Sequence, residues 1–112
     1  MDISQFLILL LECLSGIEFV EKVDIQTEVV ALKGRVILKN HRFLQVYFNE
    51  ITKTTAFALI ENERRLWGID YDNTRGWHVH PMKHPETHNE ITSKTIKEIN
   101  RKLTQVWNSL PE

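Results

Sequence analysis

Between Ile17 and about Val79 the sequence has the periodicity of an antiparallel sheet. β-branched and aromatic residues come there in short runs that are separated by polar breaks. In the clearest run, Leu44, Val46 and Phe48 alternate with Phe43, Gln45, Tyr47 and Asn49. Since successive side chains of a strand point to opposite faces, one face of this sheet is predicted to be packed and the other to be more polar.

Five or six strands are predicted in this region. They cover approximately residues 18–31, which is long enough to be broken in the middle, 34–39, 42–49, 53–61, 64–71 and 76–80. Turns are predicted at Asn40-His41, between Glu50 and Thr52, at Asn62-Glu63 and from Asp72 to Thr74. Short connections of this kind predict a meander, in which each strand pairs with the next.

Helical periodicity flanks the sheet region on both sides. The first helix is predicted to end near Gly16, with an apolar stripe of Ile3, Phe6, Leu7, Leu10, Leu11 and Leu14. The last is predicted to begin at Thr92 or Thr95 and to end at Pro111, with a stripe of Ile96, Ile99, Leu103, Val106 and Leu110. We therefore predict one α+β domain over residues 1–112, with both helices on the same face of the sheet.

Length and composition agree with a single globular domain. The chain has 112 residues, of which 42% are hydrophobic and 26% charged, and this balance excludes a disordered or collagen-like chain. Cys13 is the only cysteine and cannot form an intrachain disulfide, which favours a reducing compartment. No apolar run approaches ~18 residues, and the N-terminus lacks the basic region of a signal peptide, so we expect a cytoplasmic protein without a membrane span.

The charges are unevenly distributed. Residues 1–32 carry six acidic and one basic side chain, whereas residues 33–112 carry thirteen basic and nine acidic ones. One acid-free basic stretch contains Lys33, Arg35, Lys39 and Arg42, and a second basic group contains Lys94, Lys97, Arg101 and Lys102. Two interpretations remain open, a solvated surface and a surface that binds phosphates.

Four of the five histidines, His78, His80, His84 and His88, lie within the segment GWHVHPMKHPETH. If residues 76–80 form a strand, His78 and His80 point to one face about 6.5 Å apart and Trp77 points to the other. We expect the two imidazoles to be partly solvent-accessible and Trp77 to be largely buried. A helical turn at Pro85-Glu86 would then place His84 and His88 about one turn apart.

Three interpretations of this histidine cluster compete. In the first, His78, His80 and His88 bind a metal ion. In the second, the histidines transfer protons without any cofactor, and RNA is a suitable substrate because its 2′-OH is an internal nucleophile. Arg75 and Lys83 would then contact the phosphate. The third interpretation is a solvated polar loop without chemistry.

Several of these residues also carry a family resemblance. Asp72-Asn73, then Gly76-Trp77-His78-Val79-His80-Pro81, then Pro85 and His88 resemble the TumE-type toxins of bacterial and archaeal toxin–antitoxin pairs. The resemblance implies a compact α+β toxin that is associated with RNA degradation and neutralised by an antitoxin with a helix-turn-helix domain. The residues carried over are Asp72, Asn73, Trp77, His78, His80 and His88, and His84 is not part of the pattern.

The expected function is therefore that of a ribonuclease toxin. His78, His80 and His88 are its expected catalytic residues, and Arg75, Lys83, Arg35 and Arg42 are expected to bind RNA. An isoelectric point near 6.5 opposes this, because nucleic-acid-binding domains are usually basic. The alternative is a non-catalytic or metal-binding protein that acts through a protein partner. Ile8 and Leu9 widen the apolar face of the first helix, where a partner or a second copy of the chain would dock.

Overall fold

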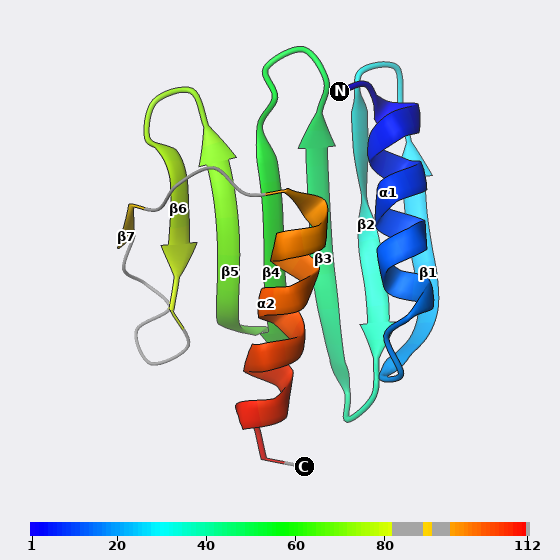
Figure 1. Cartoon of the computed structure of the whole chain (residues 1–112), viewed down its shortest axis with the longest axis vertical. Coiled ribbons are helices and arrows are strands. Elements are labelled where there is room, and N and C mark those ends of the chain that lie inside the picture. Colours follow the sequence, from blue (N-terminus) through cyan, green and yellow to red (C-terminus); the bar gives the residue numbers. More distant parts are fainter. Residues whose placement is uncertain (82–88, 91–94, 112) are drawn as a thin grey trace.

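The computed structural model describes residues 1–81, 89–90 and 95–111, which form two layers. Helix α1 (Ile3–Ser15) is followed by the strands β1 (Val20–Thr27), β2 (Ala31–Leu38), β3 (Arg42–Asn49), β4 (Thr55–Glu61), β5 (Arg64–Asp72) and β6 (Gly76–His80) (Figure 1). The two-residue strand β7 (Asn89–Glu90) and helix α2 (Ile96–Ser109) complete the order. Each strand pairs antiparallel with the next, which confirms the predicted α+β meander with a helix at each end.

The predicted strand boundaries differ from the structure mainly near the start of the sheet. The segment 18–31 is interrupted after Thr27, and β2 begins at Ala31, three residues earlier than predicted. A hydrogen bond from the Glu28 N–H to the Ala31 carbonyl, 2.7 Å long, closes the turn between the two strands. Strand β7 was not predicted, and the helical turn predicted at Pro85-Glu86 lies outside the described residues.

Two of the predicted turns show backbone geometry that suits two-residue hairpins. Asn40 and His41 have φ values of 63° and 62°, and Asn62 and Glu63 have φ values of 51° and 64°. Positive φ at both central residues twists the chain in the direction that paired strands require. These turns hold β3 in register with β2 and β5 in register with β4.

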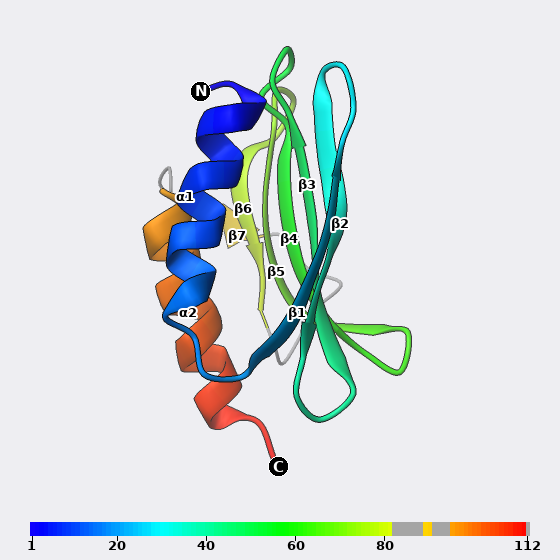
Figure 2. The same cartoon turned by 90° about the vertical axis from the view of Figure 1, so that its right-hand side faces the viewer.

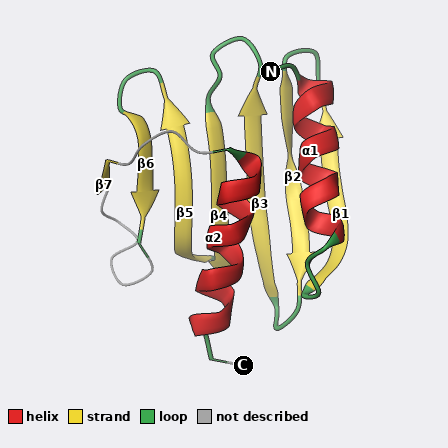
Figure 3. Cartoon of the chain, in the orientation of Figure 1, coloured by secondary structure: helices red, strands yellow, loops and turns green. Residues whose placement is uncertain are grey.

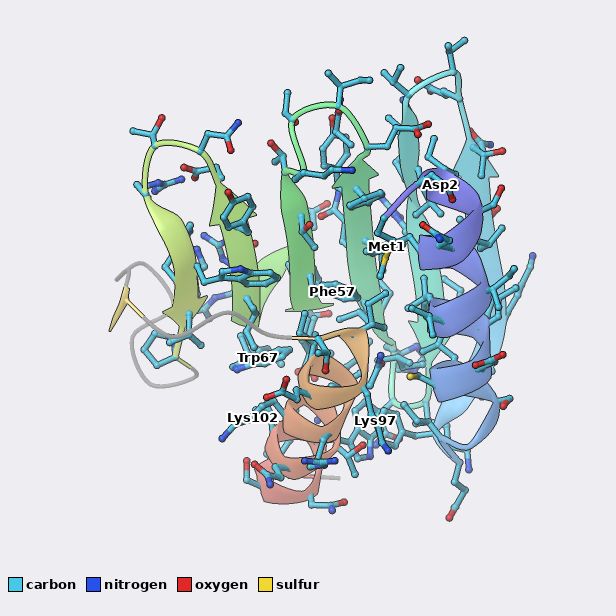
Figure 4. The ribbon with its side chains drawn as sticks, turned by 45° about the horizontal axis from the view of Figure 1, so that its top comes forward. Met1, Asp2, Phe57, Trp67, Lys97 and Lys102 are labelled. Carbon is cyan, nitrogen blue, oxygen red and sulfur yellow. The ribbon has the colours of Figure 1, made fainter. Side chains whose placement is uncertain are left out.

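Both helices cover the same face of the sheet, as predicted (Figures 2 and 3). The core contains Phe6, Leu10 and Leu14 from α1, Ile96, Ile99 and Leu103 from α2, and Leu44, Val46, Phe48, Phe57, Leu59, Trp67 and Ile69 from the sheet. Phe6 stacks on Phe48 with a distance of 4.3 Å between the ring centroids. Figure 4 shows Phe57 and Trp67 on the side of the sheet that the helices cover.

Each helix begins with a capping box. The Asp2 carboxylate accepts a hydrogen bond from the Gln5 backbone N–H at 2.8 Å, and the Thr95 hydroxyl accepts one from the Glu98 backbone N–H at 3.1 Å. In return, the side-chain oxygen of Gln5 accepts a hydrogen bond from the Asp2 N–H, and that of Glu98 accepts one from the Thr95 N–H. Thr95 is therefore the residue that starts α2, in agreement with one of the two predicted starts.

The second face of the sheet, which we call the open face, carries no helix among the described residues (Figure 2). The tip of the β4–β5 hairpin bends away from the helices toward this side (Figure 2). A register shift between Leu59 and Ile60 accompanies the bend, as expected where one strand carries an extra residue.

Candidate functional site

Two rows of paired residues cross the open face from β1 to β6. The first row consists of Asp24, Arg35, Gln45, Ala58, Gly68 and His80. The second row consists of Gln26, Lys33, Tyr47, Ala56, Asp70 and His78. Because Ala56, Ala58 and Gly68 are small, the face is hollow between the cations of β2 and the histidines of β6.

This hollow is an open groove of about 550 Å³. Its lining includes the cations Lys33, Arg35 and Arg65 and the carboxylates Asp24 and Asp70. The guanidinium of Arg35 lies over the Phe43 ring, with 4.5 Å between its central carbon and the ring centroid. The groove therefore presents three cations and two carboxylates beside small side chains, and its cations can contact the phosphates of a nucleic-acid strand.

The side chain of Arg65 lies beside Gly68 in the groove. A Cβ atom at Gly68 would lie 3.4 Å from the Cδ of Arg65 and 2.9 Å from the Phe57 carbonyl oxygen. One guanidinium nitrogen of Arg65 lies 4.0 Å from the Asp70 carboxylate. Arg65 was not predicted as a site residue, and the signal that could have pointed to it was Gly68 inside a predicted strand, since such a glycine often marks a close approach.

At the β6 end of the groove, Asp70, His78 and His80 meet. The Nε2 of His80 lies 2.9 Å from the Asp70 Oδ2, and the Nε2 of His78 lies 3.5 Å from the same oxygen. The two imidazole centroids are 5.4 Å apart, and the ring planes are inclined at 73°. Because an ionised carboxylate only accepts hydrogen bonds, His80 donates its Nε2–H to Asp70.

A backbone carbonyl fixes the orientation of the His78 ring. The Nδ1 of His78 lies 3.1 Å from the carbonyl oxygen of Gly76. Since a carbonyl cannot donate, Nδ1 carries a proton and donates it to Gly76. The ring is thereby held with its Nε2 directed at Asp70.

The structure confirms that His78 and His80 share a face, but the expected solvent exposure was wrong. Each histidine is only 1% exposed. Strand β6 lies inside the sheet between β5 and β7, and both rings pack against each other and Asp70. Trp77 points to the helix side, as predicted, where it is partly buried against the core and its ring lies 5.4 Å from that of Tyr71. Asp70, whose side chain is 19% exposed, is the most accessible member of the cluster.

Arg42 does not share a surface with Arg35, which corrects the predicted placement. It is buried on the helix side, donates hydrogen bonds to Glu61 and to the Pro111 carbonyl oxygen, and lies 4.9 Å above the Trp107 ring. Strand alternation explains the separation. Arg42 lies two residues before the buried Leu44 on β3, so both side chains point to the face that the helices cover. Arg42 thus holds the end of α2 to the sheet.

Arg75 lies on the β5–β6 turn, outside the lining of the groove. Asp72 accepts hydrogen bonds from the backbone N–H groups of Thr74 and Arg75, at 3.0 and 2.7 Å, and forms an ion pair with the Arg75 guanidinium at 3.0 Å. The Arg75 backbone N–H is the main reason that the pKa of Asp72 is lowered. Asp72 therefore closes the turn, whereas Lys83, His84 and His88 lie outside the described residues.

The cations of the chain lie on both sides of the sheet and form no single surface among the described residues. Lys33 lines the groove, and its ion pair with Glu28 at 2.9 Å raises the pKa of this lysine, chiefly through a hydrogen bond. Lys97 and Lys102 project from α2 on the other side (Figure 4). The described cations of the two basic groups therefore do not share one face, since Lys33 and Arg35 line the groove whereas Arg42, Lys97 and Lys102 lie on the helix side.

The cluster has a composition that can bind a cation as well as a proton. The ligand atoms of Asp70, His78 and His80 all lie within 4.8 Å of one another.

None of the described helices is long and apolar enough to cross a membrane. Comparisons of the chain with protein-family models, with curated proteins and with solved structures find no match.

Proposed function

We propose that this chain is the toxin of a toxin–antitoxin pair and acts as a ribonuclease. The observation that carries the proposal is a cationic groove that ends at a carboxylate in contact with two imidazoles. In this account the phosphates of an RNA strand lie beside Arg35 and Arg65. The sugar that follows them is brought to the Asp70–His78–His80 cluster.

The chemistry requires only one proton acceptor and one proton donor. The 2′-oxygen of RNA attacks the adjacent phosphorus while the bond from phosphorus to the 5′-oxygen breaks. The proton of the 2′-OH passes to the cluster, and the cluster delivers one proton to the leaving 5′-oxygen. The products are a 2′,3′-cyclic phosphate and a free 5′-OH. Arg65, 4.0 Å from Asp70, is close enough to stabilise charge on the phosphate.

The burial of the imidazoles sets a condition on this mechanism. RNA arriving in the groove meets Asp70 first, because both histidines are almost inaccessible. Proton exchange therefore requires the bound sugar to reach His80 past Asp70. A histidine pair that stayed inaccessible in the RNA complex would have a structural role instead.

Replacing Arg35 and Arg65 together with alanine is expected to weaken RNA binding and reduce its dependence on salt. Each lost phosphate contact lowers the slope of log affinity against log salt by about 0.7 on a single strand, so the pair lowers it by about 1.4. Fluorescence anisotropy with a labelled single-stranded RNA at several salt concentrations measures this slope. The matched control is Lys97→Ala with Arg101→Ala on α2, and an equal effect of the two double variants would exclude the groove as the RNA-binding surface.

The proposed antitoxin partner has a candidate surface on α1. Ile8 is 57% exposed and Leu11 is 42% exposed, and the acidic Glu12 lies next to them. An apolar and acidic surface suits a basic protein partner. Co-expression with a helix-turn-helix protein encoded beside this chain is expected to restore growth, and toxicity that the neighbour does not relieve would contradict the pairing. A second copy of the chain is the other candidate occupant, which sedimentation of the purified chain detects.

A further inference from the structure

We propose that the Asp70–His78–His80 cluster binds one divalent transition-metal ion, with Zn²⁺ as the best match, and that the bound ion inhibits RNA cleavage. Metal binding is inferred from the geometry of the cluster alone. Inhibition rests on the proposed ribonuclease function. The two parts can therefore be tested separately.

The two distances from the Asp70 carboxylate to the imidazole nitrogens are close to those of a tetrahedral site. Two metal–ligand bonds of about 2.0–2.1 Å at a tetrahedral angle hold their ligand atoms about 3.3 Å apart. The Asp70 Oδ2 lies 2.9 Å from the His80 Nε2 and 3.5 Å from the His78 Nε2. All three ligand atoms lie within 4.8 Å of one another. Binding of one ion would require the two imidazole nitrogens to approach to about 3.3 Å, a movement that side-chain rotation can supply.

The types of donor atom select the metal. Two imidazole nitrogens and one carboxylate oxygen form a set that Zn²⁺ accepts, whereas Mg²⁺ and Ca²⁺ prefer oxygen ligands. The hydrogen bond from His78 Nδ1 to the Gly76 carbonyl, at 3.1 Å, is the outer contact that metal-binding histidines usually make. It leaves the lone pair of a neutral His78 on Nε2, the atom that faces Asp70.

The backbone holds the three ligands in place before any ion arrives. His78 and His80 are separated by one residue on β6, and Asp70 is paired directly with His78 across β5 and β6. Asp70 lines the groove and gives an ion a route from solvent. The ion must displace the Nε2 proton that His80 donates to Asp70, which moves to the Nδ1 of the same ring, and the ion pair between Arg65 and Asp70, whose atoms are 4.0 Å apart. Three protein ligands leave a fourth position for water or a phosphate oxygen.

A metal ion at this position would stop the proposed proton transfers. Bound to the Nε2 atoms of both histidines and to Asp70, the ion occupies the atoms that would accept and release protons. RNA would still bind along Arg35, but the 2′-OH would lose its proton acceptor. Zn²⁺ is therefore expected to inhibit the enzyme and not to activate it.

Titration of the full chain with Zn²⁺, after treatment with EDTA and dialysis, tests the site directly. Isothermal calorimetry and competition with a chromophoric chelator are expected to show one Zn²⁺ per chain and no Mg²⁺ at the same concentration. Co²⁺ is expected to produce the visible absorption of a tetrahedral complex. Asp70→Asn and His80→Gln should each bind Zn²⁺ at least about tenfold more weakly, because each replaces a ligand by a poorer one. His41→Asn, on the exposed β2–β3 turn, is the matched control and should bind like the wild type.

Circular dichroism of each variant shows whether weaker binding reflects a lost ligand or a lost fold. Wild-type affinity in both folded ligand variants, or no Zn²⁺ binding by the wild type, would overturn the metal site. Zn²⁺ binding by a chain that never cleaves RNA would support the metal site and contradict only the ribonuclease proposal. RNA cleavage that Zn²⁺ stimulates would overturn the inhibition.

Discussion

His80→Gln is expected to reduce RNA cleavage by at least about 100-fold, which is the lower end of what a positioned acid or base contributes. Glutamine has nearly the size of histidine and retains an N–H group that can donate to Asp70. The variant therefore removes proton transfer at neutral pH and largely preserves the hydrogen bond, which is 2.9 Å long in the wild type. Single-turnover cleavage of a labelled RNA, with the folded state checked by circular dichroism, measures the loss.

The matched control for this loss is His41→Asn. His41 lies on the exposed β2–β3 turn with a φ of 62°, a conformation that asparagine tolerates well. Its cleavage rate should remain within about twofold of the wild-type rate. Unchanged cleavage by His80→Gln would remove the cluster from the chemistry and leave it a structural role on the open face.

Leu103→Ala is expected to lower the free energy of unfolding by about 2–5 kcal/mol. Leu103 is fully buried on α2, in the core that joins both helices to the sheet. Truncation would leave a cavity that the two layers could fill only by moving closer together. Urea denaturation followed by circular dichroism measures the change. Leu11→Ala on the exposed side of α1 is the control and should cost less than about 0.5 kcal/mol.

A loss below about 1 kcal/mol for Leu103→Ala would contradict the packing described above. The stripe on α2 would then belong to an interface with another molecule and not to the core.

Much of the fold could be predicted because alternation and turn signals agree along most of the sheet. The range 42–49 matches β3 and the range 76–80 matches β6. The β1–β2 turn was missed because it contains Val29 and Val30, β-branched residues that favour strands. Val29 is 92% exposed, so its place in the turn depends on the tertiary structure and not on local propensity.

The candidate site was predicted only in part. Alternation was enough to place His78 and His80 on one face. Asp70 was missed because its contact with them depends on the β5–β6 register, which pairs Asp70 with His78. Residue spacing within a single strand does not reveal that register. The burial of the imidazoles was also missed, because it depends on neighbouring strands and on side chains from elsewhere in the chain.

Two of the three arginines expected to bind RNA, Arg35 and Arg42, show how strand alternation could have been applied further. Arg35 alternates with the buried Val36, which places Arg35 on the open face. Arg42 lies two residues before the buried Leu44 on the same strand, which places its side chain on the face that the helices cover. The alternation of side chains along a strand distinguishes the two residues, whereas their shared positive charge does not.

The chemical identity of the cleavage products tests the central claim most directly. The purified chain is incubated in EDTA with a defined single-stranded RNA and with the same strand carrying one 2′-deoxy sugar, and the fragment ends are identified by mass spectrometry. Cleavage by the cluster predicts 2′,3′-cyclic phosphate and 5′-OH ends, with no cut after the 2′-deoxy position. Intact RNA, 5′-phosphate ends, or a cut after the 2′-deoxy sugar would contradict the proposed mechanism.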